Sequence, residues 1–168
     1  GGTHIYLMNT NGTNVRKFTF SQGIDTEPVF SSDGRYVYFT SDRGGSPQIY
    51  RQAVDSRLAE RVTYNCDYAI SPAISPKGDK LAFISRTAGA FRVTLLDLNT
   101  MSQMILTDTV RDESPTFAPN GKVLVYATEE RGVGVLATVS LDGLVRTRLT
   151  GRRGDIREPT WGPLLTKQ

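Results

Sequence analysis

The chain has 168 residues, of which 38% are hydrophobic and 22% charged, and its formal net charge is +3. This is the composition of a globular protein, and it excludes a disordered or low-complexity chain. The longest aliphatic and aromatic run, residues 123–127, is far shorter than the roughly 20 residues that cross a bilayer. The first nine residues lack the basic start and apolar core of a signal peptide, so we expect neither a membrane span nor a signal sequence.

One unit of the sequence is repeated along the chain. Its opening proline recurs at spacings of 44, 43 and 44 residues, as Pro28, Pro72, Pro115 and Pro159. A turn pair and a closing threonine recur with it, as Asp33-Gly34, Lys77-Gly78 and Asn120-Gly121, and as Thr19, Thr63, Thr107 and Thr150. A period of about 40 to 50 residues with several short strands in each unit is typical of β-propeller blades. We therefore predict an all-β propeller of four-stranded antiparallel blades.

The chain opens in the middle of a unit. Residues 1–22 match only the last two strands of a blade, at 5–8 and 15–19, joined by the hairpin signal Asn11-Gly12. Three full blades follow, at residues 23–63, 64–107 and 108–150. The predicted strands of these blades are 29–31, 35–40, 48–53 and 59–63; then 73–75, 80–85, 92–97 and 103–107; then 116–118, 122–128, 134–140 and 145–150.

Residues 151–168 match only the start of a unit, so we predict one inner strand over 158–165, followed by a tail. The whole is a half blade, three full blades and a terminal strand. We interpret it as one propeller domain that forms part of a larger ring.

Catalytic groups are scarce in the sequence. His4 is the only histidine and lies at the very start of the chain, so we expect neither a Ser/His/Asp triad nor a multi-histidine metal site within the chain, and we interpret His4 as a surface residue. Cys66 is the only cysteine and has no partner base beside it, so we interpret it as a semi-buried small residue. We expect no enzymatic activity.

A basic cluster lies near the C-terminus and gives two interpretations. Basic patches supply non-specific affinity for nucleic acids, with a steep dependence on salt. The second interpretation is that these arginines alternate along an outer strand and its loop and are only solvated. We favour it because no aromatic residues, which would stack on bases, are interleaved among them. We therefore expect no nucleic-acid partner for Arg146, Arg148, Arg152, Arg153 and Arg157.

The candidate site consists of the four segments that precede the inner strands, here called the mouth segments: residues 23–28, 65–72, 110–115 and 154–159. In a propeller such segments gather around one mouth of the central channel. Many of their residues are acidic, which suits a basic or amphipathic protein partner or a calcium ion in the channel. The alternative is that short polar residues before proline only terminate loops. The candidate partner-binding residues are Asp25, Thr26, Glu27, Asp67, Tyr68, Ala69, Asp112, Glu113, Asp155 and Glu158.

Three stretches resemble the propeller repeat of the TolB family of the Tol–Pal cell-envelope system. They are the blade core over residues 30–50, Asp112-Glu113-Ser114-Pro115 with Ala118-Pro119-Asn120-Gly121, and the ending Trp161-Gly162-Pro163-Leu164-Leu165. The resemblance covers essentially the whole chain. Two features depart from the pattern: Tyr68-Ala69-Ile70 before the second proline, and Lys77-Gly78 in place of an acidic turn.

The resemblance implies a non-catalytic, periplasmic binding protein with a six-bladed propeller behind an N-terminal α/β domain. It implies that the mouth segments, including Thr26-Glu27-Pro28, dock the peptidoglycan-associated lipoprotein Pal and hold the protein at the outer membrane. It also implies contact with TolA through an N-terminal segment that this chain lacks, uptake of colicin-type bacteriocins, and a role in outer-membrane integrity and envelope constriction during division.

The alternative function is a gating propeller of a prolyl oligopeptidase-like serine peptidase. That enzyme would carry its catalysis in a separate hydrolase domain, with a G-x-S-x-G nucleophile motif that this sequence does not contain.

Overall fold

The computed structural model describes residues 2–149 and 154–162. Within these ranges the chain forms fourteen strands and no helix, and all strands that share a sheet pair antiparallel. No helix that could cross a membrane is therefore found in this part of the chain. The predicted all-β fold is confirmed.

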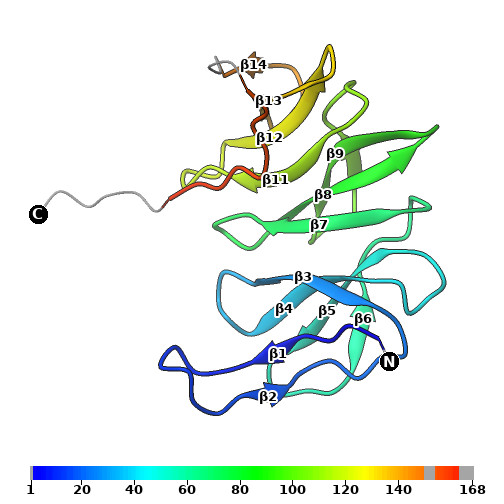
Figure 1. Cartoon of the computed structure of the whole chain (residues 1–168), viewed down its shortest axis with the longest axis vertical. Coiled ribbons are helices and arrows are strands. Elements are labelled where there is room, and N and C mark those ends of the chain that lie inside the picture. Colours follow the sequence, from blue (N-terminus) through cyan, green and yellow to red (C-terminus); the bar gives the residue numbers. More distant parts are fainter. Residues whose placement is uncertain (1, 150–153, 163–168) are drawn as a thin grey trace, which may run out of the picture.

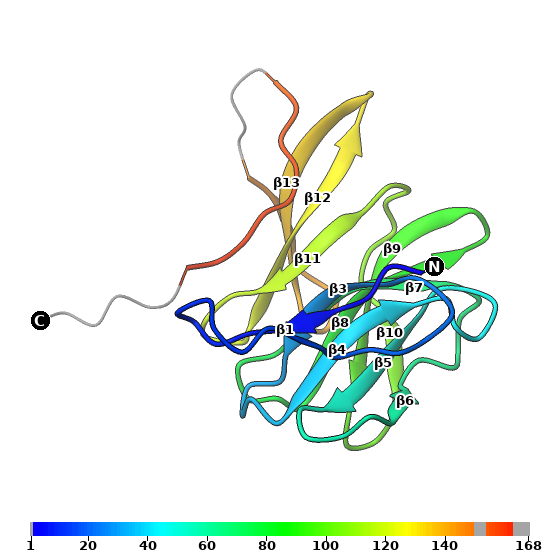
Figure 2. The same ribbon diagram turned by 60° about the horizontal axis from the view of Figure 1, so that its bottom comes forward.

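The strands form successive meanders, each a sheet whose strands follow one another in chain order (Figures 1 and 2). The half blade is β1 (Tyr6–Leu7) and β2 (Arg16–Lys17). The first blade is β3 (Asp25–Phe30), β4 (Tyr36–Ser41), β5 (Gln48–Ala53) and β6 (Ala59–Arg61). The second blade is β7 (Ala69–Ile74), β8 (Lys80–Thr87), β9 (Ala90–Asp97) and β10 (Gln103–Ile105). The third blade is β11 (Glu113–Phe117), β12 (Val123–Glu130), β13 (Val133–Ser140) and β14 (Arg146–Arg148).

The inner strand β7 lies between the inner strands β3 and β11 and contacts both, as expected for strands that face a propeller channel (Figure 1). The turns between first and second strands lie at one end of them. Gly34, Gly78 and Gly121 in these turns have φ values of 70°, 75° and 68°, a region that favours glycine and explains the repeated turn pair. The opposite end carries the starts of the inner strands and forms the face that we call the mouth.

Most predicted strand ends differ from the structure by one or two residues, and two differences are larger. The inner strands begin earlier than expected, at Asp25, Ala69 and Glu113, because pairing continues on the far side of the proline. The described part of the predicted terminal strand, residues 158–162, forms no strand, since no neighbouring strand among the described residues pairs with it. Thr150 and residues 163–165 of these predictions lie outside the described residues.

The hydrophobic core lies between blades. One cluster joins the half blade to the first blade and contains Phe18 and Phe39. A second joins the first and second blades and contains Ile49 and Phe83, and a third joins the second and third blades around Tyr126. Each blade is therefore stabilised mainly by burial of apolar surface against its neighbours.

The repeated threonines close each unit by the same hydrogen bond. The hydroxyls of Thr19, Thr63 and Thr107 accept the backbone N–H groups of Ile5, Ile49 and Val93, each at 3.0 Å. All three threonines are buried. The hydroxyl thereby satisfies a backbone donor that has no water to bond, which accounts for the recurrence of threonine.

Candidate functional site

Each inner strand carries a bulge at its proline. The pairing register shifts between Thr26 and Val29 in β3, and at the equivalent positions of β7 and β11. Proline cannot donate a ladder hydrogen bond, so the bulge falls where that bond is missing. The residue before each proline has a positive φ, between 50° and 55°, at Glu27, Ser71, Ser114 and Glu158. A non-glycine residue in this region persists only where its surroundings hold it, so the mouth has a defined backbone.

Asp25, a predicted contact residue, is only 1% exposed. Burial alone would raise the pKa of its carboxyl group, but hydrogen bonds from Ser41 Oγ, Arg43 Nη2 and Ser21 Oγ, at 2.6, 2.8 and 2.7 Å, lower the pKa below its ordinary value. A buried carboxylate held in this way stabilises the mouth and is not available for direct contact with a partner.

His4 lies beside this carboxylate, so the prediction that it is an exposed surface residue is wrong. Its side chain is 15% exposed, and Nδ1 lies 3.8 Å from Asp25 Oδ2. The segment that precedes β1 runs along the start of β3, where the N–H of Asp25 donates to the carbonyl of Thr3 at 2.8 Å. This contact joins segments of the half blade and first blade and covers His4.

Asp112 and Ala69 occupy the same repeat position as Asp25, and both are buried, at 4% and 0% exposure. Asp112 Oδ2 accepts hydrogen bonds from the Thr107 hydroxyl at 2.5 Å and from the N–H of Val93 at 3.3 Å. Asp112 Oδ1 has no hydrogen-bond partner within residues 2–149 and 154–162. The burial of Asp25 and Ala69 argues against direct contact of these two residues with a partner, whereas contact of Asp112, which lines a cleft at the mouth, stays a prediction.

Glu27 connects two blades. Its carboxylate accepts the N–H and the hydroxyl of Ser71, at 2.9 and 2.7 Å, and the hydroxyl of Thr40 at 2.7 Å. Thr26, next to it, is exposed on the mouth. Glu27 therefore clasps the first blade to the second, next to the exposed side chain of Thr26.

In the second mouth segment, Asp67 is exposed and Tyr68 is half-buried. The Tyr68 ring meets Phe91 edge to face at a centroid distance of 5.8 Å, and the guanidinium of Arg86 lies 4.9 Å from the Tyr68 centroid. Cys66 is half-buried, as predicted, and burial raises the pKa of its thiol. Phe91 and Arg86 therefore fix the orientation of the Tyr68 ring, which stays partly exposed at the mouth.

The third and fourth mouth segments meet through an ion pair. Arg157 Nη1 lies 3.8 Å from Glu113 Oε2, and Arg157 Nη2 lies 3.4 Å from Asp155 Oδ2. Asp155 also accepts the N–H of Gly134 at 2.6 Å, and this hydrogen bond is the main cause of its lowered pKa. Glu158 is exposed.

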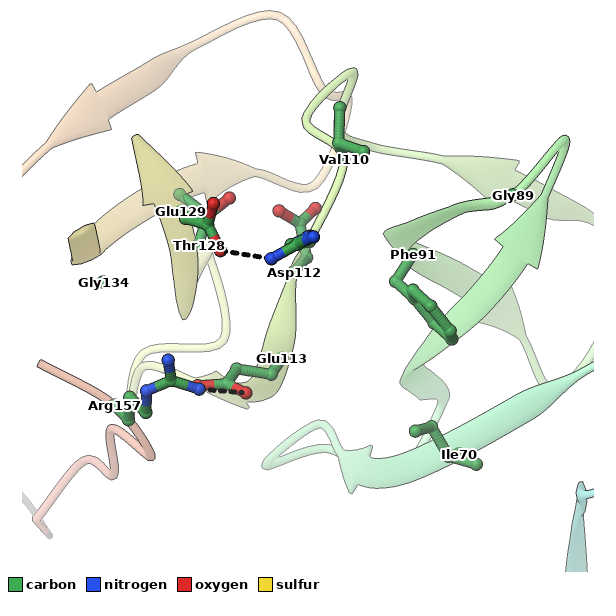
Figure 3. A pocket seen from close by; sticks show the side chains of 11 residues that line it. Ile70, Gly89, Phe91, Val110, Asp112, Glu113, Thr128, Glu129, Gly134 and Arg157 are labelled. Atoms are coloured by element: carbon green, nitrogen blue, oxygen red, sulfur yellow. Dashed lines mark hydrogen bonds and ion pairs between the residues drawn. The ribbon is translucent and has the colours of Figure 1, made fainter. Parts of the chain in front are cut away.

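A cleft of about 650 Å³ opens at the mouth between the second and third blades (Figure 3). Figure 3 shows Glu113 and Arg157 directed toward each other on one side of it. Sequence reasoning missed the residues that complete its wall, which are Ile70, Gly89, Phe91, Val110, Arg111, Thr128, Glu129, Gly134 and Arg157. Ile70, Val110, Arg111 and Arg157 lie within the mouth segments but are not acidic, and Thr128 and Glu129 come from the end of β12.

Arginines pair with some of the carboxylates at the mouth, so this surface carries charges of both signs. Arg43 pairs with Asp25, Arg111 with Glu129 at 2.8 Å, and Arg157 with Glu113. Within the described residues, no group of three or more His, Cys, Asp or Glu side chains is placed to hold a metal ion. A calcium site in the channel stays an untested expectation.

The basic cluster is also paired. Arg146 contacts Asp108, and Arg148 Nη1 lies 2.8 Å from Glu130 Oε2. Arg152 and Arg153 lie outside the described residues. These pairs favour the interpretation that the arginines are solvated on an outer strand over a role in binding phosphates.

Repeated four-stranded antiparallel blades, whose inner strands all start at one mouth, define a β-propeller. The family model described as the TolB beta propeller domain matches residues 1–165. The chain belongs to the TolB β-propeller family.

Two relatives show how closely the chain matches this family. A Tol-Pal system protein TolB of Bordetella pertussis is 51% identical over 162 residues, which are 96% of this chain and 37% of the relative. The crystal structure of TolB from Acinetobacter baumannii superposes with a TM-score of 0.86 at 41% identity, over 92% of this chain and 39% of that chain. The chain thus spans less than half the length of the relatives it matches.

A peptidase shares the fold. The structure of a puromycin-hydrolyzing peptidase of Mycobacterium tuberculosis matches with a TM-score of 0.74 at 16% identity, over 96% of this chain and 27% of that chain. Similarity at this level of identity shows the propeller fold alone and gives no support to a peptidase function.

Proposed function

We propose that this chain is a non-catalytic, protein-binding propeller of the Tol–Pal system that docks the lipoprotein Pal at its mouth. Membership of the TolB family, with 51% identity to a Tol-Pal system protein over 96% of the chain, is the observation that carries the proposal. Docking of Pal would place the protein in the periplasm, peripheral to the outer membrane. It would contribute there to envelope integrity and to constriction at division.

The mouth has the physical properties that such docking needs. Its backbone is held by the bulges and by the clasp of Glu27 on Ser71, so little order is lost when a partner binds. Thr26, Asp67 and Glu158 are exposed on it, and Glu113 is 40% exposed at the edge of the cleft. Paired charges around a cleft favour selection of a partner by electrostatic complementarity.

Other partners of the system belong to the same proposal. TolA would contact an N-terminal segment of longer family members, and colicin-type bacteriocins would compete for the mouth. We propose no cofactor and no nucleic-acid partner for this chain.

Calorimetric titration with the soluble domain of Pal from the same organism tests the proposal. We expect saturable binding that a Thr26→Arg, Glu113→Arg variant weakens at least about tenfold, because central interface residues dominate affinity. Lys77→Glu is the matched control, since Lys77 is exposed in the turn at the opposite end of the inner strands. Absence of binding by both this chain and a complete propeller would overturn the proposal.

A further inference from the structure

Asp25 and Asp112 are equivalent positions of the repeat, each three residues before the unit's proline. Ser41 Oγ and Arg43 Nη2 both donate to Asp25 Oδ1, and Arg43 Nε donates to Ser41 Oγ at 2.9 Å. One guanidinium therefore bridges the hydroxyl and the carboxylate of the first blade.

The third blade has the same hydroxyl and carboxylate without the guanidinium. Thr128 stands at the position of Ser41, and Glu130 stands at the position of Arg43. Glu130 pairs with Arg148, on the outer strand β14. Among the residues that the structure describes, Asp112 Oδ1 and Thr128 Oγ1 both lack a hydrogen-bond partner, although each residue is only 4% exposed. Unpartnered buried polar atoms of this kind are rare and costly, so they point to a missing group.

Both residues line the cleft between the second and third blades (Figure 3). The charges of its wall do not balance. Arg111 pairs with Glu129 and Arg157 with Glu113, which leaves the Asp112 carboxylate without a cation among the described residues of the wall. The cleft therefore lacks one positive group, at the place where the first blade has Arg43.

We propose that this cleft is a subsite for the guanidinium of an arginine side chain that a protein partner supplies. The guanidinium bonds Asp112 Oδ1 and Thr128 Oγ1, as that of Arg43 bonds Asp25 and Ser41. Guanidinium suits the subsite better than ammonium because its planar fork reaches two acceptors at once. The subsite rests on the proposed function of the mouth and names one chemical group that its partner presents.

Entry to the subsite requires movement at the edge of the cleft, since both acceptor atoms are covered in the free chain. The Arg111 side chain is 70% exposed, and its pair with Glu129 is a surface ion pair of the kind that contributes little to stability. Displacement of Arg111 therefore costs little compared with a charge-assisted hydrogen bond to a buried carboxylate.

The test is titration of the chain with N-acetyl-L-arginine methylamide, followed by ¹H–¹⁵N NMR. We expect saturable shifts of the Asp112 and Thr128 amide signals. Asp112→Asn should weaken binding about tenfold or more, which is the scale of one lost charge-assisted hydrogen bond. Asp55→Asn is the matched control, because it removes the same charge from an exposed position in the turn between β5 and β6, outside the mouth, and it should leave the dissociation constant within about twofold.

Two further variants keep the proposal testable where Asp112→Asn fails to fold. Thr128→Val preserves shape and removes one acceptor, so it should weaken binding several-fold. Glu130→Arg places a guanidinium two residues from Thr128 on the same face of β12, with the spacing that Arg43 has from Ser41. This guanidinium should occupy the subsite and so weaken binding of the probe about tenfold.

The outcomes separate this inference from the proposed function. Absence of saturable shifts, or equal binding by the wild-type chain and the folded Thr128→Val and Glu130→Arg variants, overturns the subsite. If Pal still binds in that case, the proposed function stands. Specific binding of the arginine probe by a chain that does not bind Pal would support the subsite and overturn Pal as its partner.

Discussion

Glu27 and Ser71 lie 44 residues apart in the sequence, yet one carboxylate accepts both the N–H and the hydroxyl of Ser71, at 2.9 and 2.7 Å. Both residues have positive φ and precede the proline of their unit. The same carboxylate also accepts the hydroxyl of Thr40 in its own blade. Two bulges are thereby held against each other at the mouth, which couples the shape of this face to the packing of two blades.

Replacement of Glu27 by Ala should lower the free energy of unfolding by about 1 to 2 kcal/mol, since it removes charge-assisted hydrogen bonds that are partly exposed. Urea unfolding of both proteins measures the change. Glu60→Ala is the matched control: Glu60 forms an exposed pair with Arg51 and should change stability by less than about 1 kcal/mol. Equal effects of the two substitutions would contradict a clasp between blades.

The buried carboxylate of Asp25 should make stability depend on pH in the acid range. Its pKa in the folded chain lies below the ordinary value of 3.8, because hydrogen bonds from Ser41, Arg43 and Ser21 outweigh the effect of burial. Its contribution is therefore complete above about pH 4 and is lost as the pH falls through the lowered pKa.

Unfolding free energies of the wild-type chain and of Asp25→Asn, measured from pH 7 to pH 3, test this dependence. We expect the variant to be less stable by about 2 to 4 kcal/mol near neutral pH, and the difference to shrink below pH 4. Asp67→Asn, at an exposed site, controls for the change in net charge. A difference that stayed constant down to pH 3 would mean that the Asp25 carboxylate does not carry the effect.

Tyr126 should limit stability at high pH. Burial, together with the negative charge of Asp112, raises the pKa of its hydroxyl to about 12. The folded chain therefore binds this proton more tightly than the unfolded chain does, so the contribution is present below about pH 10 and is lost as the pH rises towards 12. Ultraviolet titration should show Tyr126 ionising last, and Tyr126→Phe should remove that final step. Ionisation of every tyrosine below pH 11 in the folded chain would disprove the shift.

The core between the first and second blades should depend strongly on Phe83, which is 0% exposed. Phe83→Ala should cost about 3 to 5 kcal/mol, because it removes a buried ring and leaves a cavity. Phe30→Ala is the matched control: Phe30 lies on an inner strand and is 53% exposed, so its replacement should lower the free energy of unfolding much less. Thermal or urea unfolding distinguishes the two. If Phe83→Ala lowered the free energy of unfolding only slightly, the Phe83 ring would not be central to the packing between the first and second blades.

Local patterns in the sequence were sufficient to predict the fold. Turn chemistry at Asp33-Gly34 and its repeats, together with alternation along the strands, placed β5 at Gln48–Ala53, as the structure has it. The sequence predicts the starts of the inner strands too late, because proline lacks the N–H group that a β-ladder hydrogen bond needs and therefore suggests that the strand begins after it. Only the tertiary structure shows that pairing resumes beyond the bulge, at Asp25 with Ser41.

The sequence by itself also determined that the mouth segments share one face, since that follows from strand order alone. Which of their carboxylates reach solvent was decided only by the tertiary structure. Asp25 is buried because Ser41 and Arg43, which lie 16 and 18 residues away, donate to it, and Asp112 is buried with one oxygen unpartnered. Hydrogen bonds across such separations depend on how strands pair and how blades pack, and no local pattern encodes them.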